Sequence, residues 1–176
     1  MGKHKAKAPA GQHKKKVKWP LAAALCLVIV AVFLWTGGQD TPSGALAVQT
    51  LSEGESLVIP VDELSDTVRF YPVEVNGTQM EILAAKDSQG TIRTAFNTCQ
   101  ICYSSGRGYY VQDGDALVCQ NCGNRFTVDQ VEVESGGCNP WPIFPENKSV
   151  TQETVSIPYS YLNAATQLFA NWKANF

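Results

Sequence analysis

Five cysteines between residues 99 and 138 carry the chemistry that this sequence can perform. Two Cys-x-x-Cys pairs, Cys99/Cys102 and Cys119/Cys122, stand sixteen residues apart, and Cys138 follows within a Gly-Gly-Cys-Asn-Pro segment. A tight turn places both sulfurs of such a pair on one side of the backbone, and two facing turns form a tetrahedral sulfur cage. Zinc and iron both accept thiolates in this geometry. The spacing therefore predicts a metal site, and Cys138 is one thiol more than a closed four-sulfur site needs.

The residues around the cysteines also favour a metal. Gly123 directly follows the second pair, where a glycine permits positive φ and lets backbone N–H groups point at sulfur. Tyr103 takes that place after the first pair, so the first turn is predicted to be less ideal. Arg107 and Arg125 are the nearest cations in sequence, and they can offset the negative charge of a thiolate cage. The surplus Cys138 can replace one of the four ligands, bind a second metal, or remain an unused thiol.

Thiol–disulfide chemistry is a further reading of the same cysteines. In an oxidising compartment the two pairs can close as disulfides and leave Cys138 free. Exchange activity needs an attacking thiol near a cation or a helix N-terminus, and no obvious helix follows either pair. Conventional enzyme signatures are missing, because the only histidines, His4 and His13, lie in the N-terminal tail. No catalytic residue and no organic-cofactor residue is therefore assigned.

The N-terminal segment predicts where the cysteines reside. Residues 1–18 hold seven lysines and no acid, and residues 19–35 are apolar and uncharged. Seventeen apolar residues reach the lower limit for a membrane-spanning helix, and Trp19 and Trp35 bracket the run as interfacial aromatics do. We expect a single-pass cell-membrane protein with a cytoplasmic basic tail and an extracytoplasmic C-terminal part. A cleaved signal peptide, with a cleavage site at Ala45-Leu46-Ala47, is the alternative.

Composition divides the rest of the chain. Residues 36–45 are small and polar and predict a linker, and residues 46–176 are long enough for one cysteine-rich, metal-binding domain. All sixteen acids but only seven of the fourteen basic residues follow the apolar run, so the exported part carries a net charge of −9. A nucleic-acid surface needs a basic patch, so nucleic acid is excluded as a partner.

Hydrophobic patterning predicts a mainly β (α+β) fold. The turn dipeptides Asn76-Gly77 and Asp113-Gly114 predict two hairpins, and Pro158 opens a predicted helix that extends to about Lys173. The expected architecture is an antiparallel β domain with zinc-ribbon-like cysteine turns and a C-terminal helix. Strands are expected at Ser56–Val61, Thr67–Val75, Thr78–Ala85, Thr91–Phe96, Gly108–Gln112, Ala116–Val118 and Glu153–Ile157, while Arg125–Asp129 and Gln130–Glu134 carry the chain away from the second cysteine turn.

These motifs resemble a known family. The pattern of Phe96, both Cys-x-x-Cys pairs, Gly108-Tyr109, Gly114-Asp115, and the Gly-Gly-Cys-Asn-Pro ending resembles the FtrD-like membrane iron–sulfur proteins over roughly residues 65–165. The resemblance implies a membrane-bound metal or cluster protein that supports ferrous-iron uptake or electron transfer. It further implies an iron permease or a redox protein in the same membrane as partner. The metal ligands that it implies are Cys99, Cys102, Cys119, Cys122 and Cys138.

The predicted topology leaves the metal open between iron and zinc. The first 35 residues contain no arginine, so there is no twin-arginine signal to export a folded protein with its cluster in place. An iron–sulfur cluster would then be assembled outside the cytoplasm, under more oxidising conditions. Zinc avoids both problems, and a structural zinc ribbon that supports an interaction module is the alternative function. Iron or an iron–sulfur cluster is what the family resemblance favours.

Overall fold

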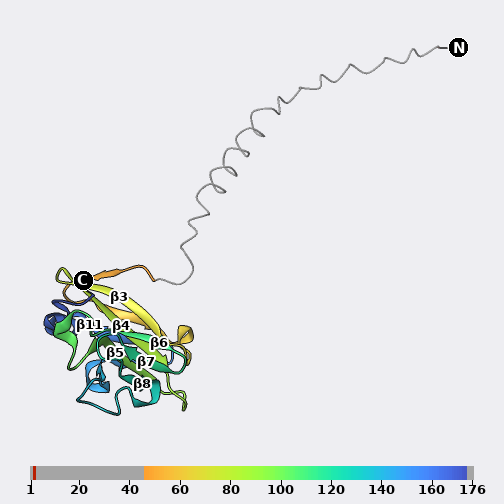
Figure 1. Ribbon diagram of the computed structural model, residues 1–176. Coiled ribbons are helices and arrows are strands. Elements are labelled where there is room, and N and C mark those ends of the chain that lie inside the picture. Colours follow the sequence, from red (N-terminus) through yellow and green to blue (C-terminus); the bar gives the residue numbers. More distant parts are fainter. Residues whose placement is uncertain (1, 3–45, 174–176) are drawn as a thin grey trace. The chain divides into compact units, whose positions relative to one another are not determined.

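The computed structural model describes Gly2 and residues 46–173 of the chain (Figure 1). The expected membrane anchor and linker, and all of the expected basic tail except Gly2, lie outside these residues. Within the described part, no helix combines the length and apolarity needed to cross a membrane. The chain divides into two units, residues 1–44 and 45–176, and the second unit carries all five cysteines of the predicted site.

A five-stranded sheet forms the frame of this second unit. Its strands, in spatial order, are β1 (Gln49–Leu51), β3 (Arg69–Val75), β4 (Thr78–Lys86), β5 (Ile92–Cys99) and β9 (Pro140–Pro142). β1 pairs with β3 in parallel, and every other pair in the sheet is antiparallel. Asn76 and Gly77 both adopt positive φ, at 51° and 73°, which is the two-residue turn that suits the twist of a hairpin. The first predicted hairpin is therefore confirmed.

Two three-stranded antiparallel sheets complete the β structure. One contains β10 (Ser149–Val150), β11 (Thr154–Pro158) and β2 (Ser56–Pro60), and the other contains β6 (Tyr110–Asp113), β7 (Ala116–Cys119) and β8 (Arg125–Thr127). The second predicted hairpin is also confirmed, with the turn at Gly114-Asp115, one residue later than the Asp113-Gly114 signal. The mainly β, antiparallel domain thus agrees with expectation, with β1, β9 and β10 as additional short strands.

The C-terminal helix is much shorter than the sequence predicts. Helix α2 spans Tyr159–Ala164, and the chain then continues as the 3₁₀ helix η5 (Thr166–Phe169). The hydroxyl of Thr166 donates to the carbonyl of Asn163, and the N–H of Ala165 donates to Leu162 three residues back. Such local bonds tighten the backbone and end the α-helical ladder. The segment packs against the core, because Leu162, Leu168 and Phe169 are buried.

Segment 130–134 is not a strand. A capping box between Thr127 and Gln130 starts the 3₁₀ helix η3 (Val128–Gln130), and a turn follows. Three further 3₁₀ turns connect strands elsewhere: η1 (Val61–Glu63), η2 (Tyr103–Ser105) and η4 (Pro145–Asn147).

The five-stranded sheet is covered on both faces. Along β4, Ile82 and Ala84 belong to a core shared with β2, β11, α2 and η5, whereas Leu83 and Ala85 belong to a second core. This alternation follows from the period of two along a strand, and covering on both faces explains the continuous apolar run at residues 82–85 of β4. The second core contains residues of β6–β8 together with Cys99, Cys102 and Cys119. The predicted metal site is therefore part of a hydrophobic core.

Candidate metal centre

A β-bulge at the end of β5 positions Cys99. Phe96 faces Trp141 in β9, but Cys99 faces the neighbouring Pro140, so two extra residues separate the paired positions on β5. One of them, Asn97, accepts a hydrogen bond from the N–H of Tyr110 at 2.7 Å and donates its amide to the carbonyl of the same residue at 3.2 Å. Bulges beside functional sites re-aim the strand. Here the bulge ties the end of β5 to β6 and delivers Cys99 to the second core.

The first cysteine turn is closed by a sulfur hydrogen bond and by close glycine packing. The N–H of Cys102 donates to Cys99 Sγ at 3.3 Å, and the carbonyl of Cys102 accepts both the N–H and the hydroxyl of Ser105. A Cβ atom on Gly108 would lie 2.4 Å from that carbonyl oxygen. Gly106 supplies the positive φ, 75°, that ends η2. The absence of glycine directly after Cys102 is therefore compensated by two later glycines.

The second cysteine turn has the form that the sequence predicts. Gly123 adopts φ of 73°, and its N–H donates to the carbonyl of Cys119 at 2.8 Å. The N–H of Cys119 in turn donates to the carbonyl of Asn124 at 2.9 Å. These bonds close the turn around the pair, so that Cys119 is buried while Cys122 is exposed. One end of the pair thus belongs to the core and the other to the surface.

Gln100 joins the Cys138 loop to the first turn. Its backbone N–H donates to the carbonyl of Asn139, and its side-chain Oε1 accepts the N–H of Gly136, both at 3.0 Å. Gly136 and Gly137 have φ of 83° and 71°, a conformation that glycine adopts without strain. The loop therefore follows a sharp path that brings Cys138 toward the two cysteine turns.

The carbonyl of Cys138 is also fixed, by side chains from two other segments. Tyr110 is a buried residue, 1% exposed, and its hydroxyl donates to the Cys138 carbonyl at 2.6 Å. The side-chain amide of Asn124 donates to the same carbonyl at 3.3 Å. Sequence reasoning missed Gln100, Tyr110 and Asn124. Gln100 and Asn124 lie within two residues of a cysteine, and Tyr110 lies two residues after Gly108. Their hydrogen-bond partners in the Cys138 loop are distant in the sequence.

The five sulfur atoms gather into two trios. The Sγ atoms of Cys99, Cys102 and Cys119 all lie within 4.8 Å of one another, and so do those of Cys102, Cys122 and Cys138. Cys102 belongs to both trios. All five are free thiols. The structure therefore brings every predicted site residue into one cluster, including the surplus Cys138.

The family comparison agrees with this cluster. The model of the family described as membrane iron-sulfur containing protein FtrD-like matches residues 64–169, from the residue after η1 to the end of η5. The chain belongs to the FtrD-like family. The matched segment contains both cysteine turns and the Cys138 loop. No curated protein and no solved structure matches the chain.

The donor set of this FtrD-like domain fits an iron–sulfur or other thiolate-bound centre. Thiolate sulfur is the ligand that iron–sulfur clusters and zinc share, and a metal–sulfur bond of about 2.3 Å sets tetrahedral sulfur edges of about 3.8 Å. The sulfurs of each trio lie no more than 4.8 Å apart, a range that includes this length.

Burial and hydrogen bonding act in opposite directions on the pKa values of the inner thiols. Burial is the largest cause at Cys119. Burial raises the pKa of Cys119 to about 12, although the N–H groups of Cys122 and Asn121 lower that pKa. Burial also raises the pKa of Cys99, but the neighbouring Tyr110 hydroxyl and the Cys102 N–H lower it further, so the result lies below the ordinary value. The inner trio therefore includes a thiol that stays protonated at neutral pH until a metal displaces the proton.

The outer thiols form a donor and acceptor pair. The hydrogen bond between Cys122 and Cys138 raises the pKa of Cys138 to about 12, with burial as a second cause. Burial raises the pKa of Cys122, but the N–H of Asn124 and the thiol of Cys138 lower it further. Cys122 therefore loses its proton more readily than Cys138.

The structure shows contacts for both arginines that the sequence singles out. Arg125 binds the carboxylate of Asp113 at 2.8 Å and the carbonyl of the same residue at 3.0 Å. Its charge is therefore engaged in the β6–β7 hairpin. Arg107 has an exposed position after Gly106 and donates its backbone N–H to Ser105.

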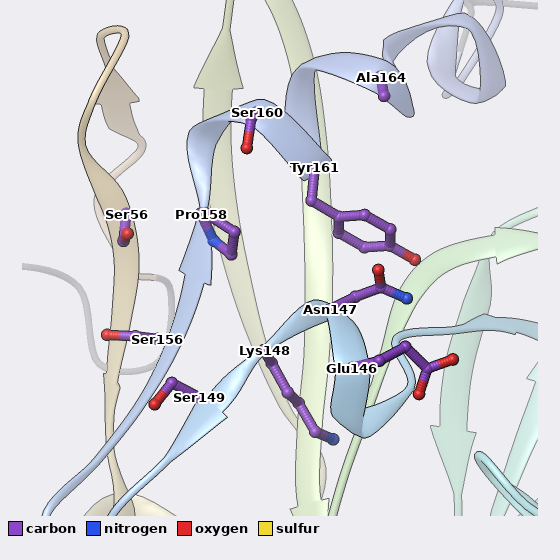
Figure 2. Close-up of a pocket in the computed structure, with 10 residues that line it drawn as sticks. All are labelled: Ser56, Glu146, Asn147, Lys148, Ser149, Ser156, Pro158, Ser160, Tyr161 and Ala164. Carbon is purple, nitrogen blue, oxygen red and sulfur yellow. The ribbon is translucent and has the colours of Figure 1, made fainter.

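The FtrD-like domain also has a surface pocket of about 600 Å³ (Figure 2). It has four serines, Ser56, Ser149, Ser156 and Ser160, which come from β2, β10, β11 and α2. Lys148 also lines it. None of the five cysteines does, so the pocket is separate from the candidate metal centre.

Proposed function

We propose that this protein is a membrane-anchored, extracytoplasmic metal-binding protein of the iron–sulfur type, which supports ferrous-iron uptake or electron transfer. One observation carries the proposal: thiols from three separate segments, two cysteine turns and one loop, gather into two mutually close trios. The proposed ligands are Cys99, Cys102, Cys119, Cys122 and Cys138. Buried cysteines that serve only as small apolar core residues do not need to lie next to one another, so the clustering of these five favours a shared ligand.

The surroundings of the cluster support a redox or iron-carrying role. Cys99 and Cys119 are 0% and 1% exposed, so the core would shield the inner part of a bound centre from water, while Cys122 reaches the surface. A bound iron centre would supply one-electron exchange. The protein residues hold the sulfurs, and Cys102 N–H donates to Cys99 Sγ, a contact that tunes thiolate basicity.

The location and partners rest on the N-terminal segment and on the family. The family is one of membrane proteins. Seven lysines before an uncharged run of seventeen residues support a cytoplasmic tail, a single span and an extracytoplasmic cysteine domain. An iron permease or a redox protein in the same membrane is the proposed partner, because a span at residues 19–35 would keep the metal centre close to the bilayer.

A structural zinc site is the second candidate. It is favoured by the inner trio, whose three sulfurs all belong to the hydrophobic core around β6–β8. A metal in such a place contributes folding energy directly. Under this alternative the domain is an interaction module, and its metal does not change oxidation state.

Metal and sulfide analysis of the full chain tests the proposal. Protein is isolated in detergent from membranes without added metal, and iron, zinc and acid-labile sulfide are measured with the visible spectrum before and after reduction. The proposal predicts iron and visible absorption that bleaches on reduction. A colourless protein with stoichiometric zinc supports the structural alternative.

Matched variants show whether the metal belongs to the cluster. Cys119→Ser should lose the metal, whereas Cys26→Ser, which removes the sixth cysteine outside the cluster, should retain it. Metal-free wild-type protein with thiols oxidised in pairs would contradict both candidates and would support thiol–disulfide chemistry.

A further inference from the structure

We propose that the cluster is divided into two metal positions: the inner trio Cys99, Cys102 and Cys119 holds a resident centre, and the outer trio Cys102, Cys122 and Cys138 binds a separate, exchangeable divalent ion. Cys102 is the shared ligand. This inference rests on the proposed function and deepens it. The outer ion would be cargo of the protein, drawn from the solvent.

Burial distinguishes the two trios. The inner thiols are 0%, 8% and 1% exposed for Cys99, Cys102 and Cys119, and all three pack in the core. In the outer trio, Cys122 is exposed and Cys138 is partly buried. An ion arriving from solvent therefore meets the outer trio first, and an ion in the inner trio is shielded from exchange.

The sulfur geometry gives each trio the means to bind one ion. Within each trio the three sulfurs lie within 4.8 Å of one another, a range that includes the edge of about 3.8 Å expected around a tetrahedral ion. Three protein ligands leave the fourth position open, which is the arrangement that permits exchange of a bound group. Because Cys102 belongs to both trios, its sulfur is placed to bridge the two ions.

The outer trio is held together by the protein itself. Cys138 belongs to neither Cys-x-x-Cys turn, yet its carbonyl is fixed by Tyr110 and Asn124. Gln100 ties the same loop to the first turn. The third ligand of the outer position is thus pre-organised, which lowers the entropic cost of binding an ion.

The ligand type selects the class of ion. The outer trio contains only thiols, and Ca²⁺ and Mg²⁺ require oxygen ligands. Thiolates suit Fe²⁺, Zn²⁺ and related divalent transition metals. Among these, Fe²⁺ is the cargo consistent with the proposed function, and Co²⁺ is its spectroscopic probe.

A cobalt titration of the full chain in detergent tests the division. The chain carries Cys26→Ser, is stripped of metal and kept reduced and anaerobic, and is titrated with Co²⁺. Sulfur-to-cobalt absorption reports thiolate binding, and a chelator is then added. We expect two kinds of bound cobalt: one that the chelator removes within minutes, and one that it does not remove.

Single substitutions assign each kind to its trio. Cys138→Ser and Cys122→Ser should each abolish the removable cobalt and preserve the retained one, and Cys99→Ser should do the reverse. Cys102→Ser should impair both, because its sulfur is shared. Circular dichroism of each variant identifies any that fails to fold, and the Cys122/Cys138 pair gives two independent tests of the outer position.

The outcomes separate the inference from the proposed function. A single kind of cobalt, lost to the same extent in all four variants, would overturn the division but leave a metal-binding function intact. No thiolate-bound cobalt in the unsubstituted cluster would overturn both.

Discussion

Gly108 lies so close to Cys102 that a Cβ atom on it would stand 2.4 Å from the carbonyl oxygen of Cys102 and 2.9 Å from the backbone nitrogen of Tyr103. No real side chain makes such contacts with backbone atoms. Gly108→Ala must therefore displace the first cysteine turn. We expect a loss of bound metal and a destabilisation of about 1–3 kcal/mol, as for other overpacked sites. Metal content and urea denaturation measure the two effects.

Gly54→Ala is the matched control for Gly108→Ala. Gly54 has φ of 88°, and nothing lies within 4 Å of the position that a Cβ atom would take, so alanine there costs about 1–2 kcal/mol of backbone strain without a clash. The control should keep its metal at a similar loss of stability. Equal metal content in the two variants would show that Gly108 does not position the turn.

Tyr110→Phe tests the anchor of the Cys138 loop. The change removes the hydroxyl that donates to the Cys138 carbonyl and leaves Asn124 as the remaining side-chain donor to it. A buried acceptor that loses a donor costs about 1–3 kcal/mol, so we expect a lower melting temperature and weaker metal retention.

Tyr71→Phe is the matched control, because it removes a tyrosine hydroxyl without removing a hydrogen bond. Within the described residues, the buried hydroxyl of Tyr71 has no hydrogen-bond partner. Its removal should be neutral or slightly stabilising. If Tyr110→Phe and Tyr71→Phe melt at the same temperature, the Tyr110 hydroxyl does not stabilise the loop.

Lys148 and Glu132 form a buried ion pair, with side chains only 3% and 4% exposed. Glu132 also accepts the N–H and the hydroxyl of Thr94 in β5, at 2.6 and 2.9 Å. Lys148→Met leaves a buried carboxylate without its cation, which costs about 3–5 kcal/mol. Lys173→Met, which breaks a partly exposed pair with Glu81, should cost less than about 1 kcal/mol. Similar losses in denaturant unfolding would contradict the role of the buried pair.

Acid should weaken the fold through Asp87. Burial raises the pKa of Asp87, but the N–H groups of Thr91 and Gln89 and the guanidinium of Arg93 lower it further, to below its ordinary value. The folded state therefore binds a proton less readily than the unfolded chain. The stability contributed by Asp87 is present above about pH 4 and is lost as the pH falls through the folded-state pKa.

Asp87→Asn isolates this contribution. The variant should be less stable than the wild type near pH 6. The difference should shrink below about pH 4, where Asp87 of the unfolded wild-type chain takes up a proton before Asp87 of the folded state does. Urea denaturation at a series of pH values measures the difference. A constant difference across that range would show that another effect of the substitution dominates.

Local signals in the sequence account for the parts of the fold that were predicted. Asn76, Gly77 and Gly114 adopt positive φ within the hairpin turns, and each cysteine turn is closed by bonds between near neighbours. These features depend on a few adjacent residues and not on the rest of the fold. The five cysteines were found for the same reason, because each belongs to a short motif that can be recognised in the sequence.

Long-range contacts explain what the sequence could not predict. Strand β9 is Pro-Trp-Pro, and its prolines are tolerated only because it lies at a sheet edge. Glu132 has the charge of a surface residue, but Lys148 and Thr94 make it a buried one. The use of Tyr110 as an anchor depends on a loop 28 residues away. No local pattern carries this information.

X-ray absorption at the metal edge of the full chain, isolated without added metal, tests the central claim most directly. We predict an iron edge with sulfur neighbours at about 2.3 Å, and a loss of this sulfur-bound iron in Cys119→Ser. A protein with no bound metal, or one whose metal has only nitrogen and oxygen neighbours, would contradict the account.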